Sequence, residues 1–156
     1  MKKILFVCMG NICRSPAAEG VLKSLINRNG LKDKILVDSA GTIDYHEGEF
    51  PDIRMIEVAE ERGYKLNHKA RQILKSDLEK FDYIITMDDQ IYTSVKRLDL
   101  KKEFHNKIFK MTDFLINLEA DEIPDPYYGN KKDFEYTLDL IEDAAKGLLN
   151  HIQREI

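Results

Sequence analysis

The chain has 156 residues, of which 43% are hydrophobic and 33% charged, and its formal net charge is −4. This size and composition predict one soluble globular domain over residues 1–156. The negative balance excludes general affinity for nucleic acid, since no basic surplus is left to neutralise a phosphate backbone. No apolar run reaches the ~18 residues that a membrane span needs. We therefore expect neither nucleic acid nor a membrane as a partner.

Strand and helix patterns alternate along the chain. A continuous apolar run predicts a strand over 3–7 that is buried on both faces. After a polar loop over 8–14, Ser15 and Pro16 have the positions of an N-cap and a first-turn proline, in a helix that Gly30 ends. We further predict strands over 34–37, 81–87 and 107–111, helices over 52–62 and around 91–98, and a long terminal helix with an apolar stripe of Phe134, Leu138, Ile141, Ala145, Leu148 and Ile152.

This alternation predicts an α/β fold. We expect a single doubly wound domain with a four-stranded parallel sheet, right-handed crossovers and helices on both faces. Ligands of such sheets bind beyond the carboxyl ends of the strands, near a topological switch point. The loop after the first strand is therefore the expected site.

That loop, over 8–15, has the features of an oxyanion site. It ends at a helix N-terminus, where free N–H groups and the helix dipole attract a dianion. Gly10 and Asn11 suit the positive φ angles that turn backbone amides inward, and the planar guanidinium of Arg14 can hold two phosphate oxygens. The Gly-Lys-Ser/Thr ending of a nucleotide P-loop is absent. We expect phosphate contacts from Met9, Gly10, Asn11, Ile12, Cys13, Arg14 and Ser15.

Cys8 begins this loop, so its sulfur is expected at the base of the oxyanion site, where the positive field favours the thiolate. A thiolate beneath a phosphate is placed for in-line attack on phosphorus. A cysteine that ends a strand is by itself more typical of a small buried hydrophobe, but Arg14 and Ser15 at this spacing favour the nucleophile. Ser15 is placed to cap the helix, to donate a hydrogen bond to the sulfur, or to do both.

A candidate proton donor lies near the C-terminus. Cleavage of an aryl phosphate needs a proton for the leaving oxygen, and Asp125 stands between two prolines that stiffen its backbone. Tyr127 and Tyr128 can wall a flat substrate ring. Pro-Asp-Pro is also ordinary turn material, and on its own this motif favours the turn.

With these motifs together, the sequence resembles the low-molecular-weight protein tyrosine phosphatase family. Residues 7–16 carry the signature loop of that family, and 125–129 carry its general-acid loop. The resemblance spans essentially the whole chain and implies a phosphatase that acts on phosphotyrosine and small aryl phosphates, with no cofactor and no metal. Further similar segments follow in the expected order at 38–42, 68, 70–72, 81–84 and 87–88.

The resemblance implies a role for each matched residue. Cys8 is the nucleophile and becomes a phosphocysteine, Arg14 binds phosphate and stabilises transition-state charge, and Asp125 acts first as acid and then as base. Tyr45 stands at a wall position that is Trp in many members. The implied support of the loop comes from Asn11, Ser15, Ser39 and His68, with Asp88 near His68, and the implied pocket walls are Tyr45, Tyr127 and Tyr128.

Two cysteines and the resemblance together indicate the setting and the partners. Cys8 and Cys13 lie five positions apart and cannot form a disulfide framework, so reduced thiols and a cytoplasmic location are expected. Under oxidation the two thiols are hypothesised to pair reversibly. The expected partners are phosphotyrosine-containing proteins, with inorganic phosphate or other oxyanions as inhibitors, and the expected state is a monomer or weak dimer.

Two other functions are compatible with part of this pattern. A thiol-dependent arsenate reductase uses the same fold and anion loop, but its chemistry relays oxidation through further cysteines, and none follows Cys13. A non-catalytic phosphotyrosine binder or a phosphocarrier needs neither an arginine clamp nor a remote acid. Arg14 and Asp125 together therefore disfavour that second reading.

Overall fold

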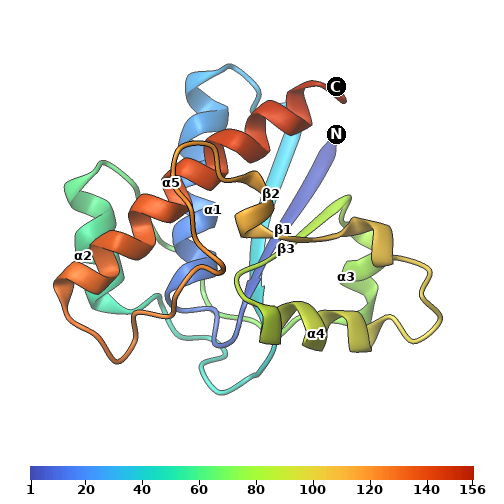
Figure 1. Cartoon of the computed structure of the whole chain (residues 1–156), viewed down its shortest axis with the longest axis horizontal. Helices are drawn as coiled ribbons and strands as arrows, with labels where there is room; N and C mark the ends of the chain where they lie inside the picture. Colours follow the sequence, from blue (N-terminus) through green and yellow to red (C-terminus); the bar gives the residue numbers. More distant parts are fainter.

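A four-stranded parallel sheet forms the centre of the computed structural model, which describes residues 1–156 (Figure 1). The order of the strands is β2-β1-β3-β4. β1 pairs in parallel with β2 on one side and with β3 on the other. The predicted α/β class with four parallel strands is confirmed, and the strand bounds are β1 Lys2–Cys8, β2 Ile35–Gly41, β3 Tyr83–Thr86 and β4 Ile108–Lys110.

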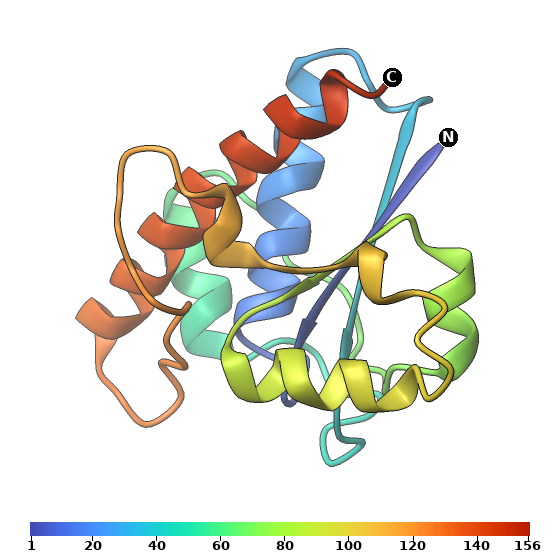
Figure 2. The same cartoon turned by 45° about the vertical axis from the view of Figure 1, so that its right-hand side comes forward.

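Helices cover both faces of the sheet. Figures 1 and 2 show α1, α2 and α5 on one side of the sheet and α3 and α4 on the other. None of these helices combines the length and the apolar composition needed to cross a bilayer. Their bounds are α1 Arg14–Arg28, α2 Ile53–Glu61, α3 Lys75–Lys80, α4 Asp89–Leu98 and α5 Lys131–Gln153, with short 3-10 helices η1 His105–Lys107 and η2 Met111–Phe114.

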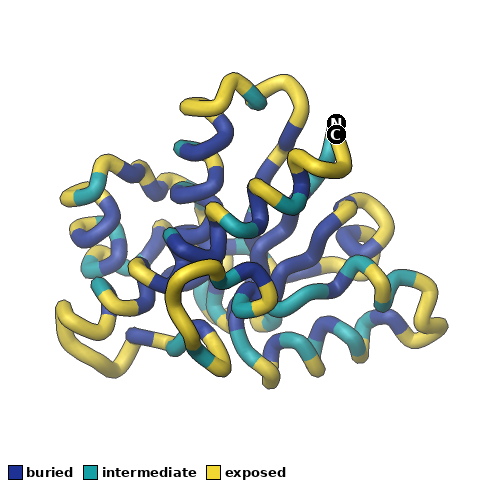
Figure 3. Tube along the Cα trace, turned by 45° about the horizontal axis from the view of Figure 1, so that its top comes forward, coloured by how far each residue is buried: buried dark blue, intermediate teal, exposed yellow.

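The alternating side chains of β1 divide the interior into two cores. Ile4 and Phe6 are fully buried in the larger core with α1 and α5, whereas Leu5 and Val7 belong to the smaller core beneath α3 and α4. A strand that is covered on both faces must be apolar at every position, which explains the continuous run in the sequence. Figure 3 shows buried residues along the interior of the trace and exposed residues mainly at its periphery.

The structure corrects two local predictions and adds one helix that the sequence did not predict. Ser15 is not the N-cap, because α1 begins at Arg14 and its cap residue Cys13 makes no side-chain capping bond. β2 does not end at residue 37 but continues to Gly41, because 38–41 pair with the last residues of β1. The sequence did not predict α3, which has six residues and a single apolar side chain, Leu78, too few for a helical period.

The course of the chain places the site at one edge of the sheet. The connection after β1 leads to β2 on one side of it, whereas the connection after β2 crosses to β3 on the other side, so the two diverge at the carboxyl end of β1. This point is the topological switch, where open α/β sheets bind ligands. Cys8 is the last residue of β1, and Gly41 is its partner at the end of β2. The loops after both strands therefore meet beside Cys8.

The long helix α5 fixes the segment that leads back to this edge. Buried Asp143 accepts hydrogen bonds from the backbone N–H groups of Ile116, Asn117 and Leu118, with the shortest at 2.8 Å. Burial alone would raise the pKa of Asp143, but these three donors hold it below its ordinary value. Further along, the Thr137 hydroxyl donates to the carbonyl of Pro124 at 3.0 Å. The residues around Asp125 are thus tied to α5.

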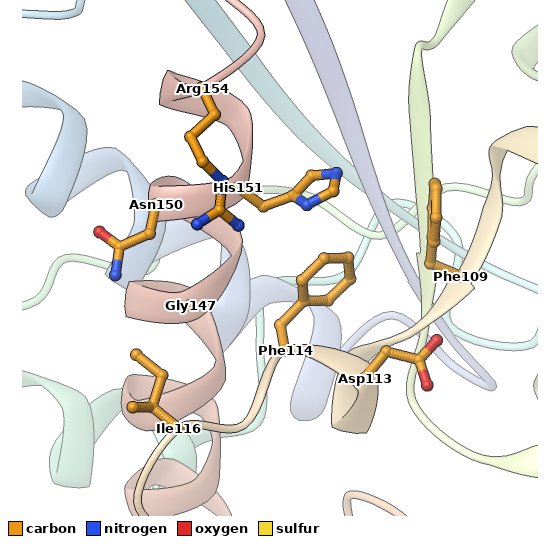
Figure 4. Close-up of a pocket in the computed structure, with 8 residues that line it drawn as sticks. All are labelled: Phe109, Asp113, Phe114, Ile116, Gly147, Asn150, His151 and Arg154. Carbon is orange, nitrogen blue, oxygen red and sulfur yellow. The ribbon is translucent and has the colours of Figure 1, made fainter.

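Close packing of η2 on α5 depends on Gly147. Figure 4 shows Phe114 and Ile116 beside the helix at this glycine. A Cβ atom at Gly147 would overlap the carbonyl oxygen of Phe114, which is a backbone atom and cannot rotate away. A hollow of about 550 Å³ runs along this seam. Figure 4 draws the residues that line it, which come from β4, from η2 and the chain just after it, and from the C-terminal part of α5 and the residue after it.

We predict that Gly147→Ala destabilises the protein, although alanine favours a helix over glycine by about 1 kcal/mol. The overlap must push η2 away from α5, and overpacking of this kind costs about 1–3 kcal/mol. Urea unfolding measures the change, with Lys146→Ala as the control, because Lys146 is the exposed neighbour on the same helix. Equal or greater stability of Gly147→Ala would contradict the packing described here.

Candidate active site

The loop over 8–15 forms the floor of the site. Cys8 is buried, and its Sγ lies 2.9 Å from the Ser15 hydroxyl. The carbonyls of Cys8, Met9 and Ile12 accept hydrogen bonds from the backbone N–H groups of Thr42, Ile43 and Asp52, respectively. None of the N–H groups of residues 9–13 donates to another group of the protein. The loop therefore directs its acceptors to the surrounding chain and keeps its donors for a ligand, as an anion nest does.

Asn11 holds the loop in this conformation. It is in the left-handed region, with a φ of 57°. Its Oδ1 accepts from the Arg71 backbone N–H at 3.0 Å and from His68 Nε2 at 3.1 Å. Its Nδ2 donates to the hydroxyls of Ser15 and Ser39, at 2.7 and 3.0 Å. The predicted supports Asn11, Ser15, Ser39 and His68 thus form one buried network.

Gly10 and Gly41 allow the loop to pack closely against its neighbours. Gly10 was expected at positive φ, but only Asn11 takes that conformation within the loop. At Gly10 an added Cβ would lie 3.0 Å from the ring of His46. At Gly41 it would lie 2.6 Å from the carbonyl oxygen of Met9. Both glycines therefore make room for neighbouring groups that come from other parts of the chain.

A cluster of Glu19, Asp38 and His68 lies behind the network. Their ligand atoms are within 4.8 Å of one another, and carboxylate and imidazole groups of this kind can bind divalent metals. Each carboxylate is already paired, however, Glu19 with Lys23 and Asp38 with Arg71. Glu19 also accepts from the Ser39 hydroxyl at 2.6 Å. The cluster acts as a support for Asn11.

Sequence reasoning assigned no role to Glu19, although a signal was present. Glu19 is a charged residue on the buried face of α1, between Ala18 and Val21, and it is only 4% exposed. A carboxylate in that position requires partners. Those partners, His68 and Ser39, come from distant loops and strands, so the sequence could flag Glu19 but could not say what it binds.

The buried guanidinium of Arg14 presents two free donors to the site. Its Nη1 donates to Asp88 Oδ2 at 2.7 Å and to the carbonyl of Ile123 at 2.9 Å. Its Nε and Nη2 make no hydrogen bond in the protein, and this edge suits two oxygens of one anion. Burial alone would lower the pKa of Arg14, but the charge of Cys8 and the bond to Asp88 raise it above its ordinary value.

Asp88 was predicted near His68, and that prediction is wrong. Asp88 contacts Arg14 and caps α4 by accepting from the Ile91 N–H at 2.8 Å. The physical reason lies in the sheet order. Asp88 follows β3, whereas His68 and Arg71 belong to the segment beside β2, and β1 lies between the two strands. Asp88 therefore orients Arg14 and has no part in the Asn11 network.

The loop lies at the base of a pocket of about 470 Å³. Asp125 stands at its rim, 44% exposed, with Oδ2 3.8 Å from Arg14 Nη2. Asn11 and Ser15, which were predicted to contact phosphate, are buried behind the pocket and do not line it. The predicted wall residues do line it, and the full set is Cys8, Met9, Gly10, Ile12, Cys13, Arg14, Ile43, Tyr45, His46, Asp125, Tyr127 and Tyr128.

Ile43 and His46 are pocket residues that the sequence did not reveal. His46 Nδ1 lies 3.0 Å from Glu49 Oε2, and its ring packs edge-on against Tyr45 with centroids 4.7 Å apart. Both residues belong to an irregular loop without hydrophobic periodicity. Only the packing of that loop over Gly10 brings them to the pocket.

The two cysteines of the loop have different environments. Both are buried and free. Burial, together with the nearby charges of Asp52, Cys8 and Asp125, raises the pKa of Cys13 well above its ordinary value, which keeps it a neutral thiol. Cys8 instead faces the Ser15 hydroxyl at the base of the pocket. Both cysteines line the pocket, but only Cys8 contacts the Ser15 hydroxyl, and a reversible disulfide between Cys8 and Cys13 remains a hypothesis.

We predict that Asn11→Ala weakens the binding of inorganic phosphate by about tenfold or more. Alanine loses the amide's four hydrogen bonds, each worth about 1 kcal/mol, and the left-handed conformation costs it a further 1 kcal/mol or so. Isothermal calorimetry measures the affinity. Asn29→Ala is the control, because the Asn29 amide bonds only within the far end of α1. Unchanged phosphate affinity in Asn11→Ala would refute this role.

Comparison with known proteins identifies the family. Residues 3–156 match the family described as low molecular weight phosphotyrosine protein phosphatase. The protein of that name from Gallus gallus is 39% identical over 150 residues, which cover 96% of this chain and 94% of the relative.

Solved structures of related proteins support the same family assignment. The protein tyrosine phosphatase from Entamoeba histolytica, crystallised with Hepes in its active site, is 43% identical, has a TM-score of 0.96 and covers 99% of each chain. An arginine phosphatase from Drosophila is 32% identical, with a TM-score of 0.89 and a match that covers 97% of this chain and 98% of that one. The chain belongs to the low molecular weight phosphotyrosine protein phosphatase family and is a protein-tyrosine phosphatase.

Proposed function

We propose that the protein hydrolyses phosphotyrosine by way of a phosphocysteine at Cys8, with Arg14 as the phosphate clamp and Asp125 as the general acid and base. One observation carries this proposal. The pocket whose base is Cys8 is lined by Met9, Gly10, Ile12 and Cys13, whose N–H groups have no acceptor in the protein, and by Arg14, whose Nε and Nη2 make no hydrogen bond. These donors fit the oxygens of a phosphoryl group and stabilise the charge that develops on them during transfer.

In the first step, the thiolate of Cys8 attacks phosphorus in line with the leaving oxygen. A P–S bond forms while the P–O bond to the tyrosyl oxygen breaks, and that oxygen takes the proton of Asp125. The Ser15 hydroxyl supports the anionic sulfur. Because its oxygen already accepts from Asn11 Nδ2, its own proton is available to Sγ, 2.9 Å away. The products of this step are the dephosphorylated tyrosyl side chain of the substrate and the phosphocysteine.

In the second step, water attacks the phosphocysteine. The carboxylate of Asp125 accepts a proton from the water, a new P–O bond forms, and the P–S bond breaks with its electron pair returning to sulfur. Inorganic phosphate then leaves. Asp125 can serve both steps because it stands at the exposed rim of the pocket, where the leaving tyrosine is replaced by solvent.

The walls of the pocket favour a phenyl ring as the group that carries the phosphate. Ile12, Ile43, Tyr45 and Tyr127 offer apolar and aromatic surface on which a flat ring can pack. The substrate guanidinium of a phosphoarginine would meet few acceptors on these walls. We therefore propose phosphotyrosine in proteins as the substrate class, although a structural neighbour is an arginine phosphatase.

The same site accounts for further expected properties. An oxyanion that fills the anion nest competes with substrate, so we propose inhibition by inorganic phosphate. The sulfonate-bearing Hepes in the active site of the Entamoeba relative supports this. The free thiols Cys8 and Cys13 are suited to a reducing compartment, and we propose a cytoplasmic location. We further propose a monomer or weak dimer that does not act on nucleic acid.

We predict that Cys8→Ser abolishes turnover of para-nitrophenyl phosphate and still binds inorganic phosphate. The hydroxyl is a far weaker nucleophile than a thiolate, whereas the backbone donors and Arg14 are unchanged. Turnover assays and calorimetry measure the two properties on the same sample. Residual turnover within tenfold of the parent protein would reject Cys8 as the nucleophile, and loss of phosphate binding would reject the assignment of the anion site.

We predict that Asp125→Ala slows hydrolysis of phenyl phosphate by roughly 10²–10⁴-fold, the usual contribution of a general acid. The loss should be much smaller for a dinitrophenyl ester, whose leaving group needs no proton. Rates across a series of aryl phosphates test this, with Glu122→Ala as the control for an exposed carboxylate in the same segment. A loss that is equal for good and poor leaving groups would remove Asp125 from the acid role.

A further inference from the structure

Arg54, at the start of α2, is anchored to the phosphate-binding loop through Asp52. Its Nε and Nη2 donate to the two oxygens of the Asp52 carboxylate, at 3.0 and 2.8 Å. Asp52 also caps α2 by accepting from the Arg54 N–H, and its own N–H donates to the carbonyl of Ile12 at 2.8 Å. The orientation of the guanidinium is thus set by the loop that carries Cys8.

The face of the same guanidinium meets the segment that carries Asp125. Its Cζ lies 5.4 Å from the centroid of the Tyr127 ring and 4.7 Å from that of Phe134. Phe134 is fully buried in the first turns of α5, whereas Tyr127 is a partly exposed wall of the pocket. Arginine stacks on aromatic faces in this way. The contact holds Tyr127 between the pocket and the fixed end of α5.

Tyr127 is in turn coupled to Asp125. Its backbone N–H donates to Asp125 Oδ1 at 3.1 Å, and Pro126 between them restricts the backbone. By stacking on Tyr127, Arg54 restrains the residue whose backbone N–H holds the carboxyl of Asp125. A chain of contacts runs from the anion site through Asp52, Arg54 and Tyr127 to Asp125.

We propose that Arg54 is a positioning residue that sets the distance between the Asp125 carboxyl and the ester oxygen of an aryl phosphate. This inference rests on the proposed role of Asp125 as the acid. Proton transfer requires hydrogen-bond reach of the leaving oxygen, and a displacement of about 1 Å can cost about a hundredfold in rate. Arg54 does not bind the phosphate, because two of its donors are taken by Asp52 and it stands outside the residues that line the pocket.

A purely structural role for Arg54 makes a different prediction. Contact with Phe134 also joins α2 to α5, so removal of Arg54 can loosen that packing without any effect on the acid. Arg62 offers a matched control, because it is an ion-paired arginine just past the other end of α2 and binds Asp139 and Glu142 on α5. It lies outside the pocket.

The test compares Arg54→Lys, Arg54→Met and Arg62→Lys in hydrolysis of aryl phosphates with graded leaving groups. Arg54→Lys keeps the charge but loses the planar fork, and Arg54→Met keeps only the apolar stem. We expect both to lower kcat for phenyl phosphate by roughly 10–100-fold and to leave KM and the rate with the dinitrophenyl ester nearly unchanged. Arg62→Lys should show no such dependence on the leaving group.

The double variant Arg54→Met with Asp125→Ala distinguishes a positioning role of Arg54 from a purely structural one. If Arg54 acts through Asp125, its substitution adds nothing to the leaving-group dependence once the acid is gone, whereas a structural role gives an additive loss. An additive loss, or equal behaviour of Arg54→Lys and Arg62→Lys, would overturn the inference. Thermal melting checks that each variant is folded. If Arg54→Met does not fold, the comparison of Arg54→Lys with Arg62→Lys decides whether Arg54 acts on the acid.

The same series distinguishes this inference from the proposed function. If the parent protein and Asp125→Ala show the same dependence on the leaving group, the acid role of Asp125 itself fails. If Asp125→Ala behaves as expected and the Arg54 variants do not, only the positioning role of Arg54 is rejected.

Discussion

The conformation of one residue, Asn11, is the constraint on which the active site depends. Its left-handed backbone turns the loop so that the carbonyls of Met9 and Ile12 meet the neighbouring segment and the N–H groups of 9–13 remain unpaired. Four hydrogen bonds to its amide make this conformation the stable one. A polar network that is fully satisfied in this way is rigid. This network therefore holds the loop in the conformation that leaves its N–H groups without protein acceptors.

The second half of the site comes from the other end of the chain and is held by different means. Asp143 on α5 gathers the backbone of 116–118, and Thr137 fixes Pro124, so the helix carries the acid segment to the pocket. The sheet carries Cys8 to the same place, because β1 ends at the switch point. The reacting groups thus belong to two rigid elements. Arg14 and Arg54 are among the side chains that join the two parts, Arg14 through the carbonyl of Ile123 and Arg54 through the ring of Tyr127.

The active site places charged and neutral groups close together. Arg14 is almost fully buried and is oriented by Asp88, with Asp125 close by at the exposed rim. Cys13 shares the loop with Cys8, but the carboxylates of Asp52 and Asp125 and its own burial keep it protonated. A buried charge is tolerated where partners and hydrogen bonds surround it. One loop can therefore hold a neutral thiol and an anion site side by side.

The sequence by itself determined the local features. The buried strand, the loop motif over 8–15, the helix that follows and the stripe of α5 all depend on neighbours within a few positions, and hydrophobic period and residue chemistry report such neighbours directly. Tertiary structure alone decided the rest. It placed Asp88 against Arg14 and brought Glu19, His46 and Arg54 to the site. Those contacts join residues that are far apart in the chain, and their geometry exists only once the sheet order and the packing of α5 have brought the segments together.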